Sequence, residues 1–456
     1  MSENEKQEAT SPHIPELAHL AACQPEEFRR RASTIEDLAF FTDKDAAHHG
    51  IFLGVPLPRL SSISLDASDA NTEAALEPYL QPSLRRFCLY GGPVSDEFLD
   101  KLRESCPSLE HFLLDNARNL ISAAGLLRFV SGSLPLKHIE LMYGLDYALT
   151  PAVLRALARR PGLETLKVGG LLTHDTITSI SSSNDDNTTE PPTRSSTTTE
   201  KQPIFPDLRT LCCSVIEPDM LFTGLLPHLP SALGELEVVI SRNKSSSSAR
   251  NAAYKIAPNL TLLAAHCPDL HTLKLRCRFG IRVSRGDIAR FVAKLPRLEV
   301  LDISEDRKND ECGANEEEDD KDDKEEDEWE DMDSPPPLTS LRILRLTVRG
   351  PTTPISLLEA ASRWGSDLVE CELLFRGAEY DLRDPFYQGE MPVLRELEVE
   401  RLVKPRAGEE METAAREAAQ AIERIAPRLE SFRVRTASTF ANMVESIWEE
   451  ISWERR

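Results

Sequence analysis

Residues 267–275 read CPDLHTLKL, a proline followed by three leucines. Two variable residues separate Leu270 from Leu273, and one variable residue separates Leu273 from Leu275. The alternation of apolar and polar residues at the end of the stretch is typical of a short strand with one buried face. A proline just before it is typical of the end of a helix. The chain repeats this phrase along most of its length, so the phrase decides the fold.

Thirteen copies of the phrase align by their first leucine. Eight of the twelve intervals between consecutive copies are 24 to 28 residues long, and the four longer intervals contain insertions. A period of this length is typical of leucine-rich repeats, in which each unit supplies a strand and a helix. The first leucines are Leu60, Leu84, Leu109, Leu136, Leu163, Leu208, Leu233, Leu270, Leu298, Leu341, Leu368, Leu394 and Leu429.

The segments between the expected strands carry helix signals. Thr150 precedes Pro151, which indicates an N-cap residue followed by a proline in the first turn. Ser95 indicates another helix start. Short strands that alternate with helices are typical of a parallel sheet, because parallel strands need a crossover connection. We therefore predict an α/β fold, a leucine-rich repeat solenoid (horseshoe) with a parallel sheet on the concave side and helices on the convex side.

The repeated phrase resembles the ribonuclease-inhibitor-like leucine-rich repeat superfamily over roughly residues 54–435. Residues 106–109 (CPSL) and 266–270 (HCPDL) are similar to the cysteine-containing repeats of F-box substrate receptors. The resemblance implies the fold, whereas such solenoids bind many kinds of partner. Residues 14–17 (IPEL) are similar to the opening of an F-box, but the basic–aromatic ending of that motif is missing.

Composition predicts the organisation of the chain. Solenoids need caps over their terminal repeats, and segments poor in apolar residues cannot offset the entropy of ordering. The expected parts are a disordered tail (1–13), an N-terminal helical cap (14–53) in which the helical pattern runs to Phe41, the solenoid (54–436) and a C-terminal capping helix (437–456). Disordered insertions are expected near 173–202, 241–250 and 305–337.

The net charge of −23 is unevenly distributed. Residues 305–333 hold 18 acidic and 4 basic residues, a charge of −14 that leaves −9 for the remainder. This balance argues against direct binding of nucleic acid. The acidic run itself is expected to be a solvated insertion, with attraction of basic proteins as the alternative.

The cysteines and the N-terminal residues indicate the cellular compartment of the protein. Nine cysteines without a CxxC motif favour free thiols in a reducing compartment. The first residues lack a secretory signal pattern, and no window approaches the roughly 18 consecutive apolar residues of a membrane span. We expect an intracellular protein, cytoplasmic or nuclear, without membrane association.

Residues between the strand leucines should line the concave face, because successive side chains of a strand point to opposite sides. On the later repeats these residues are mostly charged. They represent either a self-neutralising ladder of exposed ion pairs or a docking surface with an acidic centre for a partner that has a basic patch. The earlier repeats are more apolar there (Tyr90, Leu113, Met142) and suggest a second contact area. The candidate partner-binding residues are Lys274, Arg276, Arg345, Glu370, Glu372, Glu396, Glu398, Glu400, Arg433 and Arg435.

No motif for nucleotide binding, metalloprotease chemistry or a nucleophile elbow occurs in the chain. His111 and His138 are expected side by side on neighbouring strands, without further ligands for a metal. We therefore expect a non-enzymatic scaffold or adaptor that binds a protein partner on its concave surface, with no cofactor and no metal. The alternative is the substrate-recognition subunit of a ubiquitin ligase, with a degenerate F-box that would bind a ligase core.

Overall fold

The computed structural model falls into two compact units. The first unit comprises Met1–Ser214 and Thr223–Pro230, and the second comprises Val215–Phe222 and Ser231–Arg456. The structure describes residues 14–40, 48–66, 76–115, 120–181, 204–241, 254–278, 281–283, 285–305, 340–349, 368–376, 393–399, 402–405, 409–435 and 438–455.

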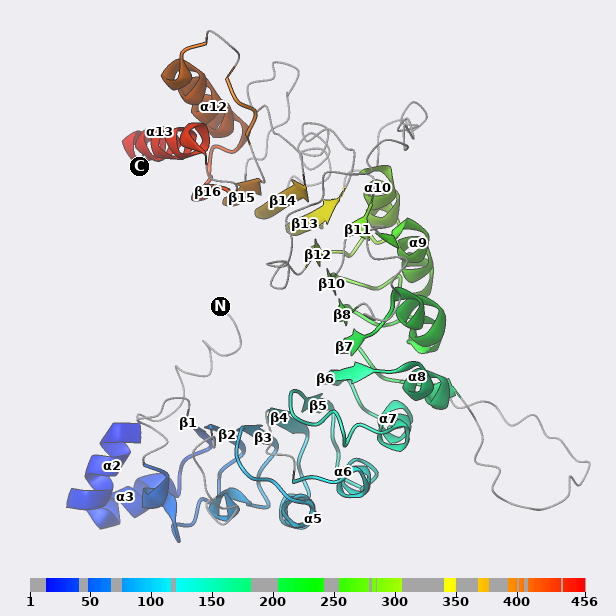
Figure 1. Ribbon diagram of the computed structural model, residues 1–456. Coiled ribbons are helices and arrows are strands. Elements are labelled where there is room, and N and C mark those ends of the chain that lie inside the picture. Colours follow the sequence, from blue (N-terminus) through cyan, green and yellow to red (C-terminus); the bar gives the residue numbers. More distant parts are fainter. Residues whose placement is uncertain are drawn as a thin grey trace, which may run out of the picture. The chain divides into compact units, whose positions relative to one another are not determined.

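The first unit is built on strands that pair in chain order. Its helices lie on one side of these strands (Figure 1). Every pair from β1 to β6 is parallel. The strands are β1 (Asp37–Phe40), β2 (Ser62–Asp66), β3 (Arg86–Tyr90), β4 (His111–Asp115), β5 (His138–Leu141), β6 (Thr165–Leu172) and β7 (Thr210–Val215). The helices are α2 (Ile14–Cys23), α3 (Pro25–Ala32), η1 (His49–Phe52), η3 (Glu77–Tyr79), α5 (Asp96–Ser105), α6 (Ala123–Val130), α7 (Pro151–Ala158) and α8 (His174–Ser181), with η4 (Met220–Leu225) and η5 (Leu226–His228) after β7.

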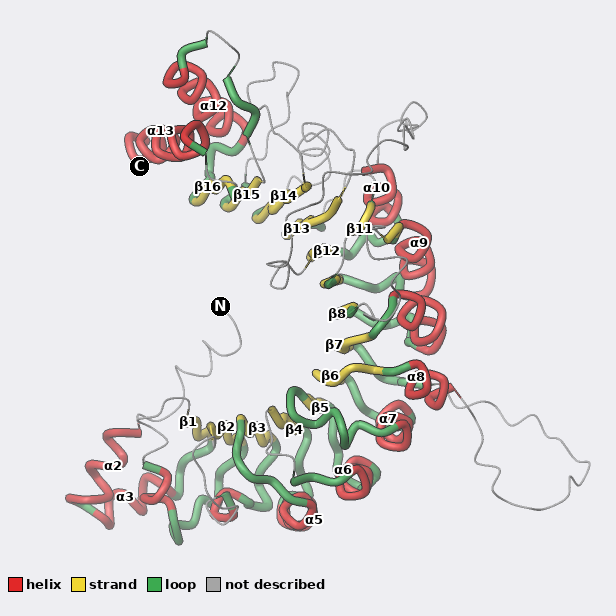
Figure 2. Tube along the Cα trace, viewed as in Figure 1, coloured by secondary structure: helices red, strands yellow, loops and turns green. Residues whose placement is uncertain are grey.

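In its described part, the second unit also has a row of strands with helices beside them (Figure 2). Its main strands again pair in parallel, while the short β11 pairs with β9 and β13. The strands are β8 (Glu235–Ile240), β9 (Tyr254–Lys255), β10 (Thr272–Cys277), β11 (Ile281–Arg282), β12 (Val300–Glu305), β13 (Ile343–Arg349), β14 (Glu370–Arg376), β15 (Glu396–Val399) and β16 (Ser431–Val434). The helices are α9 (Ala257–His266), α10 (Arg285–Ala293), α12 (Met411–Ile425) and α13 (Thr439–Arg455).

The strand register confirms the repeat analysis. Leu273 of β10 pairs with Leu301 of β12, which pairs with Leu344 of β13, and the ladder continues through Cys371 and Leu397. These side chains are at most 2% exposed. Because equivalent apolar positions of successive repeats stack on one another, they form a continuous core that no single repeat could bury alone. The fold is the predicted α/β leucine-rich repeat solenoid.

The N-terminal segment differs from the helical cap predicted for residues 14–53. Helices α2 and α3 form, but β1 follows and pairs with β2. The ring centroids of Phe28 in α3 and Phe52 are 5.6 Å apart, and those of Phe52 and Tyr79 of the next repeat are 6.4 Å apart. Aromatic packing is therefore continuous. The alternation expected of a strand is absent here, because Leu38, Ala39 and Phe40 are all buried.

Part of the segment predicted as a disordered insertion (173–202) is helical. Residues 174–181 form α8, in which Ile177 and Ile180 are 2% and 3% exposed. Two buried isoleucines are enough to place a turn of Ser/Thr-rich helix against the core. Residues 1–13, 182–203, 242–253 and 306–339, which include most of the remaining segments expected to be disordered, lie outside the described residues.

Helix α13 (Thr439–Arg455) lies within the segment predicted as a C-terminal capping helix. Helix α13 buries Trp448, which is 3% exposed and whose ring lies 6.1 Å from Phe432 of β16. Val434 N donates a hydrogen bond to Glu445 Oε1 of the same helix. The end of the second unit is therefore covered by an amphipathic helix, as the sequence pattern indicated.

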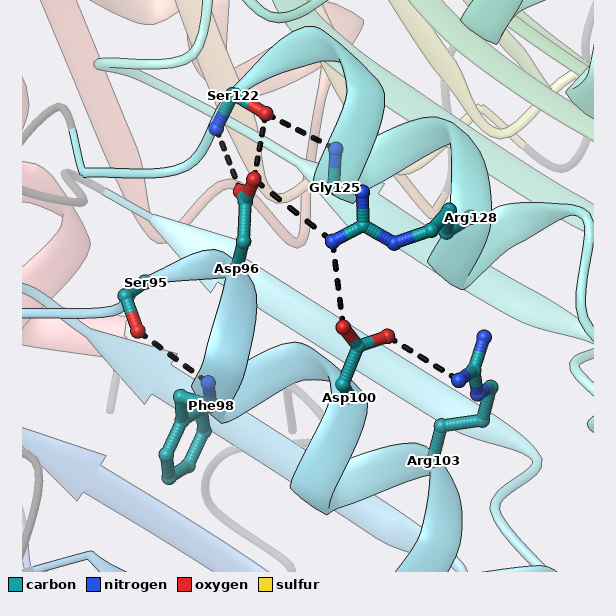
Figure 3. Close-up of polar contacts among 8 residues, drawn as sticks. All are labelled: Ser95, Asp96, Phe98, Asp100, Arg103, Ser122, Gly125 and Arg128. Atoms are coloured by element: carbon teal, nitrogen blue, oxygen red, sulfur yellow. Dashed lines mark hydrogen bonds and ion pairs between the residues drawn. The ribbon is translucent and has the colours of Figure 1, made fainter.

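Hydrogen bonds connect the N-termini of the neighbouring helices α5 and α6 (Figure 3). Phe98 N donates to Ser95 Oγ at 3.3 Å, which confirms Ser95 as the N-cap of α5. The carboxylate of Asp96 accepts hydrogen bonds from Ser122 N at 2.7 Å and Ser122 Oγ at 2.5 Å, and Ser122 is the N-cap of α6. Thr150 occupies the predicted N-cap position of α7, but its side chain makes no capping hydrogen bond.

Gly125→Ala is expected to destabilise the first unit by roughly 1–2 kcal/mol. Alanine normally stabilises a helix relative to glycine by about 0.5–1 kcal/mol. Here a Cβ at position 125 would lie 2.0 Å from Asp96 Oδ1 and displace that carboxylate from Ser122. Urea unfolding should show the opposite sign in an Asp96→Ala background, where Gly125→Ala should stabilise. Additive effects of the two substitutions would contradict this account.

Candidate protein-binding surface

The strands of the second unit carry a row of charged side chains between their buried positions. The burial of β10 alternates along the strand, with Leu273 and Leu275 buried and Lys274 and Arg276 accessible. The register then brings equivalent residues of successive repeats side by side, as predicted. We call these residues the charged strip. Its described members are Glu237, Lys274, Arg276, Asp302, Arg345, Glu370, Glu372, Glu396, Glu398, Arg433 and Arg435.

A first ion-pair cluster lies on β8 and β10. Glu237 Oε2 lies 3.5 Å from Lys274 Nζ, and its Oε1 lies 3.7 Å from Arg276 Nη1. All three side chains are between 31% and 47% exposed. Exposed pairs of this kind contribute about 0–1 kcal/mol each, so the cluster orients side chains more than it stabilises the fold.

A second cluster lies on β13, β14 and β16. Arg345 Nε donates to Glu370 Oε1 at 2.6 Å and lies 3.8 Å from Glu372 Oε2. Arg435 Nη1 approaches Glu372 Oε1 at 4.0 Å. Burial raises the pKa of Glu372, and the neighbouring Glu398 raises it further, while Arg345 opposes the shift. Glu372 therefore lies between two arginines and the like charge of Glu398.

Asp302 lies in the same row between the two clusters. The register pairs it with Lys274 on one side and Arg345 on the other. Its side chain is buried, and among the described residues its Oδ1 has no hydrogen-bond partner. Burial raises the pKa of this carboxyl group and outweighs the opposing effects of Ser304, Arg276 and Arg345.

The structure places nine of the ten predicted partner-binding residues on the charged strip, and the tenth, Glu400, lies outside the described residues. Within the described part of the chain, Glu396, Glu398 and Arg433 form no ion pair. Asp302 was not among the predicted residues, although its position between Lys274 and Arg345 could be read from the repeat alignment. Its burial and missing partner could not.

The corresponding face of the first unit is less polar and more covered. His111 and His138 are neighbours as predicted, with ring centroids 5.5 Å apart. Burial lowers the pKa of His111 to about 3, so its approach to Glu140 at 3.6 Å is not an ion pair at neutral pH. Leu113, predicted to belong to an apolar contact area, is only 7% exposed and offers little surface.

The cysteines that carry the family resemblance are core residues. Cys106 and Cys267 follow α5 and α9 as C-cap residues and are fully buried. Burial raises the pKa of each thiol to about 12, which keeps both protonated. Among the described residues, no group of three or more His, Cys, Asp or Glu side chains is placed to hold a metal ion. None of the helices in the described ranges is both long and apolar enough to cross a bilayer.

The repeats, the register and the charged strip define the class of the protein as a leucine-rich repeat solenoid. No protein-family model and no curated protein matches the chain. Among solved structures, one similar chain comes from the Rad7 and Elc1 complex of yeast, at 14% identity and a TM-score of 0.41 over 94% of this chain and 86% of that one. Another is the leucine-rich repeat-containing protein LegL7 from Legionella pneumophila, at 8% identity and a TM-score of 0.32 over 91% and 97%.

Proposed function

We propose that this protein is a non-enzymatic interaction scaffold or adaptor whose charged strip binds a protein partner with a basic patch. The observation that supports this most is the pairing of like charges on β14 and β15. Glu370 lies directly opposite Glu396, and Glu372 directly opposite Glu398. Like charges directly opposite each other on paired strands destabilise a sheet.

The chain's own cations offset this repulsion only in part. Arg345 and Arg435 contact the β14 carboxylates, whereas the β15 carboxylates have no ion-pair partner among the described residues. Glu396 is exposed and Glu398 is half-buried, so both are accessible to a partner. A basic surface docked here would relieve the repulsion and gain charge complementarity. The strip thus supports a docking surface better than a self-neutralising ladder.

The alternative is substrate recognition for a ubiquitin ligase through a degenerate F-box, which would need a separate helical domain at the N-terminus. In the described residues 14–40 and 48–52, two helices lead into a strand of the sheet, and Phe28 packs on Phe52. This arrangement supports a terminal cap on the solenoid. We therefore favour the scaffold function over the ligase function.

The test is a charge reversal of the unpaired carboxylates. With the Glu396→Lys/Glu398→Lys variant, the amount of partner recovered by affinity purification and quantified by mass spectrometry is expected to fall at least tenfold. Recovery with the wild-type chain should also fall as salt is raised, because exposed charges are screened.

The matched control is Glu412→Lys/Glu417→Lys on the exposed side of α12, which makes the same change in net charge. It should recover the partner like the wild type, and thermal unfolding should show all three proteins folded. An equal loss of partner recovery in both variants would show that binding depends only on the overall charge of the protein. Unchanged recovery with the strip variant would rule out this surface, and recovery of a ligase core would favour the alternative.

A further inference from the structure

Asp302 interrupts the ion pairing of the charged strip. The three cations nearest to it along the rows are engaged with other carboxylates: Lys274 and Arg276 with Glu237, and Arg345 with Glu370 and Glu372. Asp302 itself is 4% exposed, and its Oδ1 accepts no hydrogen bond from any residue in the described ranges. The strip is therefore divided into two paired clusters with an unpaired carboxylate between them.

An unpaired buried carboxylate is unfavourable, and most buried polar atoms in native proteins have partners. The groups that face Asp302 are Ser304, which hydrogen-bonds its side chain, the cations Lys274, Arg276 and Arg345, and the carboxylate Glu372. None of the cations supplies a donor to Oδ1. A donor from outside the chain would complete the site, but it reaches Oδ1 only if the neighbouring side chains move aside, because this atom has almost no accessible surface.

We propose that Asp302 is the recessed anchor of the docking surface and accepts an arginine side chain from the protein partner. This inference rests on the proposed function and specifies its chemistry. A guanidinium group presents a planar fork of donors that can satisfy a carboxylate with two parallel hydrogen bonds. An ammonium group is a point charge and would satisfy the site less completely.

The unpaired Glu398 offers a second contact for the same partner. Asp302 and Glu398 belong to one row and are separated by three strand steps, from β12 through β13 and β14 to β15. Neighbouring strands are about 4.8 Å apart, so the two positions are about 14 Å apart along the sheet. The partner therefore presents two basic groups with a spacing of this order.

The test uses two labelled peptides and the full-length protein. One peptide, the wide peptide, carries two arginines separated by four glycines and spans up to about 17 Å, and the other has alanine in place of the second arginine. Fluorescence anisotropy should show that the wild-type chain binds the wide peptide about tenfold more tightly than the single-arginine peptide, because only the wide peptide can contact both carboxylates. Asp302→Asn should remove this difference. Glu412→Gln, which removes one exposed carboxylate from α12, should leave it unchanged.

A stability measurement separates an anchor from a structural role. If Asp302 serves the partner, Asp302→Asn should leave the melting temperature at pH 7.5 unchanged or higher, since it removes a poorly solvated charge. The carboxyl pKa is raised in the folded state, so the wild type should become relatively more stable as the pH falls towards that pKa and lose this advantage as the pH rises through it. Asp302→Asn should lack this pH dependence.

The outcomes distinguish the two proposals. If Asp302→Asn lowers the melting temperature or binds the wide peptide like the wild type, while Glu396→Lys/Glu398→Lys loses it, the anchor is wrong and the docking surface stands. If the wild-type chain binds the wide peptide no better than either variant does, both proposals fail.

Discussion

Replacing Arg160 with methionine is expected to lower the free energy of unfolding of the first unit by roughly 3 kcal/mol. Arg160 is 8% exposed and follows α7. Its guanidinium group donates hydrogen bonds to the carbonyl oxygens of Val130, Gly132 and Leu134, which end α6 and form the connection after it. Methionine preserves the volume but leaves three carbonyl groups without this donor.

The location of the charge adds to the effect. Val130 is the last residue of α6, where the helix dipole favours a cation. Burial lowers the pKa of Arg160, but an arginine remains protonated at neutral pH. Arg160→Lys should cause an intermediate loss, because one ammonium group cannot reach three carbonyl groups in the geometry that the planar guanidinium spans.

The measurement is urea unfolding combined with hydrogen exchange of the amides of α6. Arg209→Met, a matched change of an exposed arginine in the same unit, should shift stability by no more than about 0.5 kcal/mol. Equal effects of the two substitutions would show that Arg160 contributes only its charge.

Phe112→Ala is expected to cost about 3–5 kcal/mol in the same unit. Phe112 is fully buried, with its ring 4.6 Å from Phe129 and stacked on Phe87 at 6.3 Å and an interplanar angle of 12°. Because each repeat is stabilised by its neighbours, the cavity would weaken the contacts on both sides at once.

The midpoint of urea unfolding should fall while the dependence on urea is preserved, if the array still unfolds cooperatively. The control is Tyr143→Ala, which removes an aromatic ring that is 66% exposed and should change stability by no more than about 0.5 kcal/mol. A loss of similar size from Tyr143→Ala would contradict the assignment of Phe112 to the shared core.

The repeat fold could be predicted because its signal is redundant. Each of thirteen phrases places three apolar residues at the same spacing, so an error in one repeat does not displace the others. That alignment places Lys274 opposite Asp302 and Arg345 opposite Glu372 on neighbouring strands. The strand register in the structure is the same. The alternation of side chains along a strand then determines which residues share a face.

The errors occur where the local pattern lacks that redundancy. Strand β1 has consecutive buried residues, so no alternation distinguishes it from a buried helix. Helix α8 lies in a Ser/Thr-rich segment, and only burial of Ile177 and Ile180 against the rest of the unit shows that its first turns are ordered.

The sequence by itself therefore determined the solenoid, the order of its repeats and the row of charges, because each follows from a period along the chain. Only the tertiary structure decided which of those charges are satisfied. Arg345 could contact either Asp302 or Glu370, and it pairs with Glu370. That choice depends on side-chain geometry and burial across neighbouring strands, which no spacing records. It leaves Oδ1 of the buried Asp302 without a donor among the described residues and makes Asp302 the residue on which the proposed docking depends.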